Sequence, residues 1–339
     1  MAVDEPTRTA PLACAMRGMA WRDGRVEDES VTLDELSGLA HDPSRLLWVD
    51  LVAPSDADMA VLAAHLDLPA TTVEDVLAPH ERPKLVRASD HEFFMTYAMR
   101  LDGPGSPKRL VTSRVSGLVL PHALVTIRAD DSFDMAEVVE RWNEDPALLA
   151  KGTGALLHGL LDAVVDEHFD TIQELDDAIE DLEDTLFEGG GRTTHEFIRQ
   201  IYGLRKDLVQ LRRIVLPMRE VVNGVLRHRV DEDALLTRLY DDLYDHILRA
   251  AEWTESLRDM VTTLFETNLS LQDIQLNQVM RKLAAWAAII AVPTAVTGWF
   301  GQNVPYLGFG RVLGVWLSAL LIAGGSGGLW VLFRRLDWL

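Results

Sequence analysis

Two long apolar stretches near the C-terminal end constrain the fold of this 339-residue chain more than any other feature. Leu283 to Phe300 and Val312 to Phe333 contain no Asp, Glu, Lys or Arg. At ~1.5 Å rise per residue, each stretch can cross a hydrocarbon core of ~30 Å as a helix. We therefore predict two membrane helices, at about 283–300 and 312–333. Backbone polar groups must be satisfied internally in lipid, so the link over 301–311 is an outer loop and a candidate pore mouth.

The distribution of basic residues predicts the orientation of these helices. Arg281 and Lys282 precede the first stretch, and Arg334 and Arg335 follow the second, whereas the link contains Arg311 alone. Cytoplasmic flanks carry the excess of Lys and Arg, so both termini should be cytoplasmic. The N-terminus lacks a basic region followed by a long apolar core, so we expect no cleaved export signal. The sequence thus predicts a multi-pass protein of the cell membrane, in contact with lipid.

Composition excludes several classes of function. The formal charge of −21 is carried almost wholly by the first 280 residues, which disfavours nucleic acid as a partner and favours cations. The single cysteine, Cys14, cannot form an intramolecular disulfide or a thiolate metal cluster. No phosphate-binding loop, nucleophile elbow or metalloprotease helix motif is present. We therefore expect neither an enzyme nor an organic cofactor.

The first 150 residues mix strand and helix patterns, which indicates an α/β or α+β cytoplasmic domain. Strands are expected at Leu46 to Val52 and Phe93 to Arg100, and a hairpin at Ser113 to Arg128 that turns at Leu120 to His122. Short helices are expected at 56–65, 72–77 and 132–142, the last of them capped by Ser132.

From Pro146 onward the pattern is helical, and we predict a stalk over 151–280 followed by a membrane domain over 281–339. One helix should end near Glu188, and a second should run from Thr194 to about Arg229. A third should begin after Asp233 and enter the first membrane stretch unbroken, since no Pro or Gly occurs before Pro293. Its apolar positions need partners from the two earlier helices or from other copies of the chain. These positions are Leu236, Leu239, Leu243, Ile247, Ala250, Leu257, Val261 and Leu264.

One face of this third helix is small and mildly polar. A tight helix–helix seam would have the same pattern. Asn277, Thr294 and Asn303 favour a pore instead, because polar groups along one line give an ion successive oxygen contacts in a low-dielectric region. The positions of this small face recur at steps of three and four: Asn277, Met280, Ala284, Ala287, Ala291, Thr294 and Gly298.

Several motifs resemble the CorA family of divalent-metal ion transporters, which includes the ZntB zinc branch. The likeness rests on 277–283, the proline-containing first span, 297–303 and the last residues, 334–339. Upstream, 74–77, 80–84, Leu211 to Arg213 with Pro217, and 244–246 follow the family's order and spacing.

This resemblance implies a homopentameric funnel around one shared pore. The family's outer Gly-Met-Asn motif corresponds to Gly301, Gln302 and Asn303, with Gln in place of Met, and Asn303 would contact the hydrated ion. The small face, from Asn277 to Gly298, would line the pore. Asp75 and Asp242 match a regulatory metal site between neighbouring subunits. The family's acidic residue shortly after the motif has no counterpart here.

The function implied is uptake of Mg²⁺, and also of Co²⁺ or Ni²⁺, with Mg²⁺ both transported and regulatory. A ZntB-like zinc transporter, proton-coupled or not, is the first alternative. A membrane-anchored metal sensor or scaffold is a more distant one. Five histidines, at 158, 168, 195, 228 and 246, show no metal-site spacing and are expected on helix surfaces. Paired acids at 176–177, 180–181 and 183–184 are expected on a solvated helix face.

Overall fold

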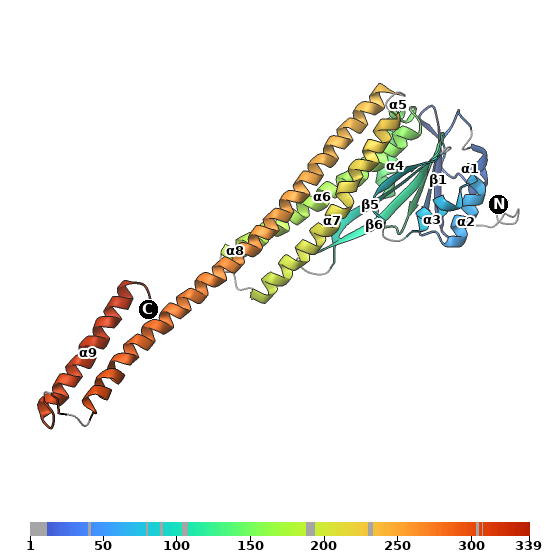
Figure 1. The fold of residues 1–339 in the computed structure, drawn as a ribbon. Coiled ribbons are helices and arrows are strands. Elements are labelled where there is room, and N and C mark those ends of the chain that lie inside the picture. The colour runs from blue at the N-terminus through green and yellow to red at the C-terminus, as the bar shows by residue number, and fades with distance from the viewer. Residues whose placement is uncertain are drawn as a thin grey trace. The chain divides into compact units, whose positions relative to one another are not determined.

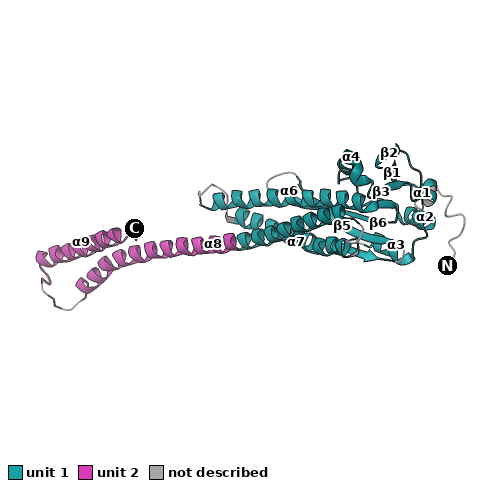
Figure 2. Cartoon of the chain, turned by 90° about the horizontal axis from the view of Figure 1, so that it is seen from above, with its two compact units in different colours: residues 1–262 teal, residues 263–339 magenta. Residues whose placement is uncertain are grey.

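The computed structural model describes residues 12–39, 42–78, 81–88, 91–103, 108–187, 194–229, 233–302, 305–306 and 308–339. The chain divides into two compact units, residues 1–262 and residues 263–339 (Figure 2). The first unit combines a β-sheet with helices, and the second contains helices alone in its described part. The predicted three-part division at residues 150 and 280 stays a prediction.

Unit 1 is built on a seven-stranded mixed sheet (Figure 1). Its strand order is β2-β1-β3-β7-β6-β5-β4, and the pair β3 and β7 is parallel while the others are antiparallel. The strands are β1 (Ala15–Arg22), β2 (Arg25–Asp28), β3 (Leu46–Val52), β4 (Lys84–Arg87), β5 (Glu92–Asp102), β6 (Arg109–Val119) and β7 (Ala123–Arg128).

Helices cover both faces of this sheet. One face packs against α1 (Leu33–Leu39), α2 (Asp56–Leu66) and α3 (Ala70–Leu77). The other packs against α4 (Met135–Glu144), α5 (Pro146–Leu149), α6 (Thr153–Phe187), α7 (Thr194–Arg229) and the first part of α8 (Ala234–Phe300). On that face the rings of Trp48 and Trp142 meet edge to face with centroids 5.4 Å apart. Unit 1 is therefore a three-layered α/β structure, and the predicted α/β fold is confirmed.

The predicted elements of the sheet were correct but incomplete. The strand at Leu46–Val52 and the hairpin are confirmed, and the backbone N–H of Leu120 donates to the Ala123 carbonyl across the turn. The start predicted for α4 was wrong: the helix begins at Met135, and the Asp134 carboxylate accepts from the N–H groups of Ala136 and Glu137. An ionised carboxylate at a helix start also interacts favourably with the helix dipole, which a hydroxyl does not.

The long third helix is confirmed, since α8 runs over 67 residues without a break. In unit 1 its apolar stripe is covered by the chain itself, because Leu243 and Ile247 are buried in one core with Leu160 of α6 and Val222 of α7. The sequence predicted that this stripe packs either on the two earlier helices or on other copies of the chain. In unit 1 it packs on the earlier helices, α6 and α7. The stripe up to Val261 therefore gives no argument for other copies.

Unit 2 contains the end of α8 and α9 (Val312–Arg335). These are the helices of the described chain that are long and apolar enough to span a membrane. They pack through small residues: a β-carbon added at Gly325 would lie 2.8 Å from Cγ1 of Val292, and the Ser326 hydroxyl donates to the Ile289 carbonyl at 3.4 Å. Ala285 is fully buried in this contact region. Small side chains let two membrane helices approach closely, and the two predicted spans are in contact through such residues.

Candidate functional site

The first part of the site is the turn that follows α8. The N–H of Gly301 donates to the Thr297 carbonyl at 2.8 Å, and the N–H of Gln302 donates to the Trp299 carbonyl at 3.3 Å. Both residues are exposed, so α8 ends with the predicted motif at its tip. Asn303 lies outside the described residues, and its role stays a prediction.

Three aromatic rings meet close to this turn, a cluster that was not predicted from the sequence. The ring of Tyr306 meets Phe300 edge to face at 4.9 Å and Phe309 at 5.2 Å. Gly308 has φ +90°, and a β-carbon there would lie 2.9 Å from the Gly314 nitrogen. Glycine is required for this close approach. The sequence does contain three aromatic residues near Pro305, Gly308 and Gly310. Their spacing alone does not reveal which rings are in contact.

The small face of α8 is exposed along its whole length. Asn277, Met280, Ala284, Ala287, Ala291, Thr294 and Gly298 are all exposed in the single chain. The Asn277 amide donates to the Asp273 carbonyl at 3.0 Å, and the Thr294 hydroxyl donates to the Ile290 carbonyl at 3.1 Å. An oxygen that donates its proton in this way keeps its lone pairs, so Thr294 can still accept from a hydrated ion.

The sides of α8 differ in what they contact. Ile289, Val292 and Val296 are partly buried, on the side that faces α9. Trp286 and Trp299 are exposed by 52% and 61%. These bulky rings suit lipid or the membrane interface, where an amphipathic indole is favoured. Exposure by itself does not distinguish the small face from this lipid-type surface; its small and polar side chains do.

The second part of the site, the predicted regulatory carboxylate in unit 1, already has a cation beside it. Nζ of Lys84 lies 2.8 Å from Oδ1 of Asp75, and Lys84 also pairs with Glu81. Burial lowers the pKa of Lys84, but the hydrogen bonds from Asp75 and Glu81 outweigh burial and raise that pKa overall. The ammonium therefore stays charged and neutralises part of the site. Apart from the presence of Lys84 in a motif that resembles the family's, no sequence pattern indicated this pair.

The other predicted metal ligand, Asp242, lies on the exposed side of α8. Its nearest ionisable partner is His246 one turn later, with Nε2 3.7 Å from Oδ2, and its side chain is 72% exposed. Within the described residues, no three His, Cys, Asp or Glu side chains are grouped as a metal site requires. One copy of the chain thus places Asp75 and Asp242 in separate polar environments and does not bring them together.

Two of the histidines expected on helix surfaces are buried instead. His168 is 1% exposed, and its Nε2–H donates to the Tyr97 carbonyl at 2.8 Å. Burial lowers the pKa of His168 to about 4, so the ring is neutral at physiological pH. His158 is 8% exposed and meets the Tyr240 ring edge to face. His168 thus hydrogen-bonds the backbone of β5 and His158 the backbone of Leu239 in α8, and helical spacing cannot indicate either contact.

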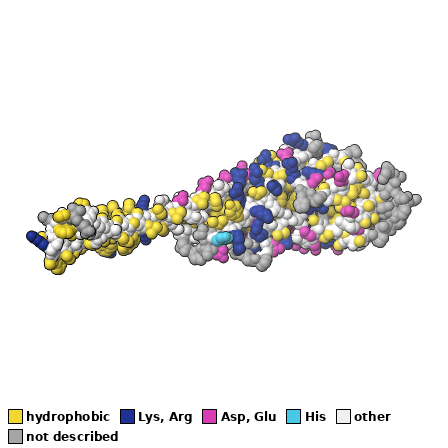
Figure 3. Space-filling view, turned by 60° about the horizontal axis from the view of Figure 1, so that its bottom comes forward, with side chains coloured by type: hydrophobic (Ala, Val, Ile, Leu, Met, Phe, Trp, Pro, Cys, Tyr) yellow, Lys and Arg dark blue, Asp and Glu magenta, His cyan; other side chains and the backbone are white. Residues whose placement is uncertain are grey.

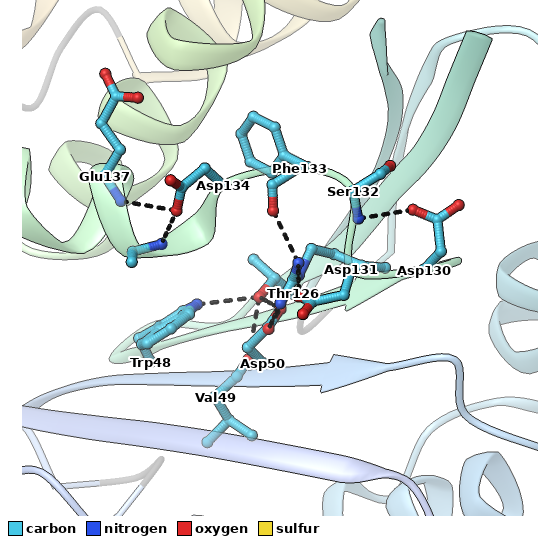
Figure 4. Close-up of polar contacts among 12 residues, drawn as sticks. Trp48, Val49, Asp50, Thr126, Asp130, Asp131, Ser132, Phe133, Asp134 and Glu137 are labelled. Carbon is cyan, nitrogen blue, oxygen red and sulfur yellow. Dashed lines mark hydrogen bonds and ion pairs between the residues drawn. The ribbon is translucent and has the colours of Figure 1, made fainter. Parts of the chain in front are cut away.

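A buried ion pair at the ends of β3 and β7 borders a surface hollow of about 620 Å³. The Nε and Nη2 atoms of Arg128 both donate to Oδ2 of Asp50, at 3.0 and 2.7 Å. Its Nη1 atom donates to the Asp131 carboxylate and to the Phe133 carbonyl in the same network (Figure 4). Thr126 donates to Asp50 at 2.6 Å. Because these groups satisfy one another, we interpret the network as a structural clamp between the sheet and the loop before α4.

Comparison with known proteins agrees with this architecture. A model of the family "CorA-like Mg2+ transporter protein" matches residues 43–335. The chain is 28% identical to "Putative metal ion transporter YfjQ" of Bacillus subtilis, over 81% of this chain and 86% of the relative. It is 25% identical to "Cobalt/magnesium transport protein CorA" of Methanocaldococcus jannaschii, over 92% and 98%. The complete structure of the Methanocaldococcus jannaschii CorA magnesium transporter superposes with a TM-score of 0.74, at 24% identity, covering 95% of this chain and 98% of that one.

The α/β unit is followed by two helices that are long and apolar enough to span a membrane, the end of α8 and α9, as in an integral membrane protein. The chain belongs to the CorA-like Mg²⁺ transporter family, whose model matches most of its length. It is therefore a cell-membrane transporter of divalent cations with two C-terminal spans.

Proposed function

We propose that this chain is one subunit of a homopentameric channel that takes up Mg²⁺ through a pore lined by the small face of α8. The observation that carries this proposal is the chemical character of that exposed face, whose side chains from Asn277 to Gly298 are mostly small and mildly polar. A face of Ala, Gly, Thr and Asn has little to gain from lipid tails, whereas it allows close packing of helices or contact with water.

An apolar extension of the same face supports assembly around a common axis. Leu269 and Leu276 are exposed by 45% and 63% and precede the predicted span. At ~100° per residue, both fall on the side of α8 that carries Met280 and Ala287. Apolar side chains outside the membrane require cover, and the same helix of other copies would provide it. The pentameric number comes from the resemblance to the family.

Neutral oxygens suit the transport of Mg²⁺. The ion holds its water tightly and demands near-octahedral geometry, so the amides of Gln302 and Asn303 and the hydroxyl of Thr294 would contact its hydration shell without replacing it. Sites that attract weakly also release, which conduction requires. With both termini in the cytoplasm, an interior-negative potential contributes ~4.6 kcal/mol per 100 mV for a divalent ion, so no coupled fuel is needed.

We further propose that cytoplasmic Mg²⁺ closes the channel by bridging Asp75 of one copy and Asp242 of the next. Carboxylates brought close together repel one another unless a cation lies between them, so bound metal would hold neighbouring copies together. Asp75→Lys or Asp242→Lys should therefore leave the channel conducting at high internal Mg²⁺. Gating that is unchanged in both variants would exclude this site.

Flux into proteoliposomes under a defined potential tests the proposed function. Mg²⁺, Co²⁺, Ni²⁺ and Zn²⁺ should be compared with and without a pH gradient, and we expect potential-driven Mg²⁺ uptake that needs no pH gradient. Asn303→Ala should abolish that flux without changing the assembly size. Uptake of Zn²⁺ alone, dependent on a pH gradient, would instead establish the zinc alternative, and assembly with metal binding but no flux would establish the sensor or scaffold.

A further inference from the structure

One face of α7 is strongly basic, although the chain as a whole carries a charge of −21. We call it the α7 basic face, and its side chains are exposed in unit 1. α7 follows the side of unit 1 that comes forward in Figure 3, where Lys and Arg side chains gather. The face consists of the exposed residues Arg199, Arg205, Lys206, Arg213 and Arg219.

The spacing of this face is typical of a surface that receives another helix. Arg199, Tyr202, Lys206, Val209 and Arg213 follow one another at steps of three and four, which is the spacing of a helix–helix seam. The two apolar residues in this row, Tyr202 and Val209, are exposed by 57% and 41%. A seam that alternates basic and apolar side chains would fit a partner helix that is acidic.

Two cations close to the α7 basic face are used in ion pairs. The neighbouring Arg212 pairs with Glu255 of α8, and Arg109 of β6 pairs with Asp207 on the buried side of α7. In contrast, no residue of the α7 basic face forms an ion pair with any part of the chain that the structure describes. Like charges along one helix repel, so this face would gain from an acidic counterpart.

The chain carries such a counterpart on α6. We call it the α6 acidic face, and it contains the exposed residues Asp170, Asp177, Glu180, Asp181 and Asp184. Asp177, Asp181 and Asp184 again follow steps of three and four. None of the five forms an ion pair within the described residues, whereas Glu174 beside them pairs with Lys108. Asp177, Glu180, Asp181 and Asp184 were expected on a solvated helix face, and in a single copy they are exposed.

The two faces lie at the same end of unit 1. α6 ends at Phe187 and α7 begins at Thr194, and the two helices contact one another. Asp177 to Asp184 occupy about the last three turns of α6, and Arg199 to Lys206 lie within about the first four turns of α7. A ring whose copies are related by rotation alone requires both halves of its interface at one height along the axis.

We propose that the α7 basic face of each copy docks on the α6 acidic face of the next copy around the ring. The proposal rests on the assembly of copies proposed above and adds a contact in unit 1 to the pore helices. A second copy is the favoured occupant because it supplies complementary charges, and Arg199, Arg205 and Lys206 of the basic face lie at the height of Asp177 to Asp184. The contact is heterologous, as a closed ring requires.

Cross-linking between two marked copies tests this contact in the full-length protein. Cys14→Ser supplies a thiol-free background, and Lys206→Cys on one tagged copy is co-expressed with Asp181→Cys on a differently tagged copy. Because each chain then carries one thiol, a short bis-maleimide can join only different copies. We expect a cross-linked product that carries both tags. Lys206→Cys paired with Glu137→Cys, an exposed position on α4, is the matched control.

Charge reversal makes the test specific. Arg205→Glu with Arg213→Glu on the first copy should lower the yield at least ~10-fold, because like charges then oppose one another. Asp177→Arg with Asp184→Arg on the second copy should restore it. Cross-linking no greater than in the control pair, or a yield that reversal leaves unchanged, would overturn the proposal. Assembly size and Mg²⁺ flux measured on the same samples separate this outcome from failure of the proposed channel, since copies that assemble and conduct without this cross-link refute the α6–α7 contact alone.

Discussion

Nζ of Lys84 lies 2.8 Å from Oδ1 of Asp75, so the carboxylate proposed to bind regulatory metal is held by an ammonium of its own chain. A divalent ion that binds there must compete with Lys84 or displace it. This competition would weaken the site and would set the range of cytoplasmic Mg²⁺ to which the channel responds.

Removal of the ammonium should strengthen metal binding in unit 1. Lys84→Gln leaves Asp75 and Glu81 without their shared cation, and at an effective dielectric suited to a protein surface we expect Mg²⁺ to bind roughly 3- to 10-fold more tightly. The concentration of Mg²⁺ that gives half-maximal inhibition of flux measures this change. Lys108→Gln, which breaks the exposed pair with Glu174, is the matched control. A half-inhibiting concentration that is unchanged or higher in Lys84→Gln would contradict competition at Asp75.

Loss of Arg128 should destabilise unit 1 severely. Asp50 is 2% exposed and would remain as an uncompensated buried carboxylate, which costs about 3–5 kcal/mol. Arg128→Met should therefore lower the apparent melting temperature strongly, whereas Arg22→Met, which breaks an exposed pair with Glu27, should cost no more than about 1 kcal/mol. Arg128→Met combined with Asp50→Leu should recover much of the loss. Equal effects of the two single substitutions would show that the Asp50 and Arg128 pair is not a clamp.

A half-buried carboxyl on α6 should make the stability of unit 1 depend on pH. Burial raises the pKa of Glu167 to about 7, against 4.5 in the unfolded chain, so the folded state favours the protonated form. The resulting stabilisation is fully present below pH 4.5 and is lost as pH rises through 7, by no more than about 3 kcal/mol.

Glu167→Gln keeps a neutral side chain of the same shape, so the variant should lose less stability than the parent between pH 5 and pH 8. Thermal unfolding followed across this range measures the difference, with Glu180→Gln, at an exposed position of α6, as the control. Parallel pH profiles of the parent and Glu167→Gln would mean that Glu167 is ionised throughout.

The long-range plan of the fold could be read from the sequence because its signals are long. A charge-free stretch of about 20 residues or a helix of 67 residues without interruption leaves few alternatives. The short edge strands β2 and β4 were missed because each has only four residues, all exposed in β2 and none fully buried in β4, and so carries no clear alternation. Asp134 replaced Ser132 as the cap of α4 because both are good capping residues and only the path of the loop decides between them.

The part of the candidate site that could be predicted is the part that lies on one face of a single helix. Periodicity placed Asn277 to Gly298 on a common side of α8, and all of them are exposed in the structure. The contact of Lys84 with Asp75 and the meeting of Phe300 with Tyr306 depend on chain segments that approach in space, which no local pattern records. Similarly, the burial of His168 follows from the unpaired edge of β5 beneath α6 rather than from the sequence of α6.

The most direct test of the central claim compares thiol access on two sides of α8. In a Cys14→Ser background, Ala291→Cys on the small face and Ile290→Cys on the neighbouring face are reconstituted, and Mg²⁺ flux is measured before and after a charged, water-soluble thiol reagent. If the small face lines the ion path, the reagent should block flux in Ala291→Cys and leave Ile290→Cys unaffected. Block at Ile290→Cys with none at Ala291→Cys, or no block at either position, would contradict a pore lined by this face.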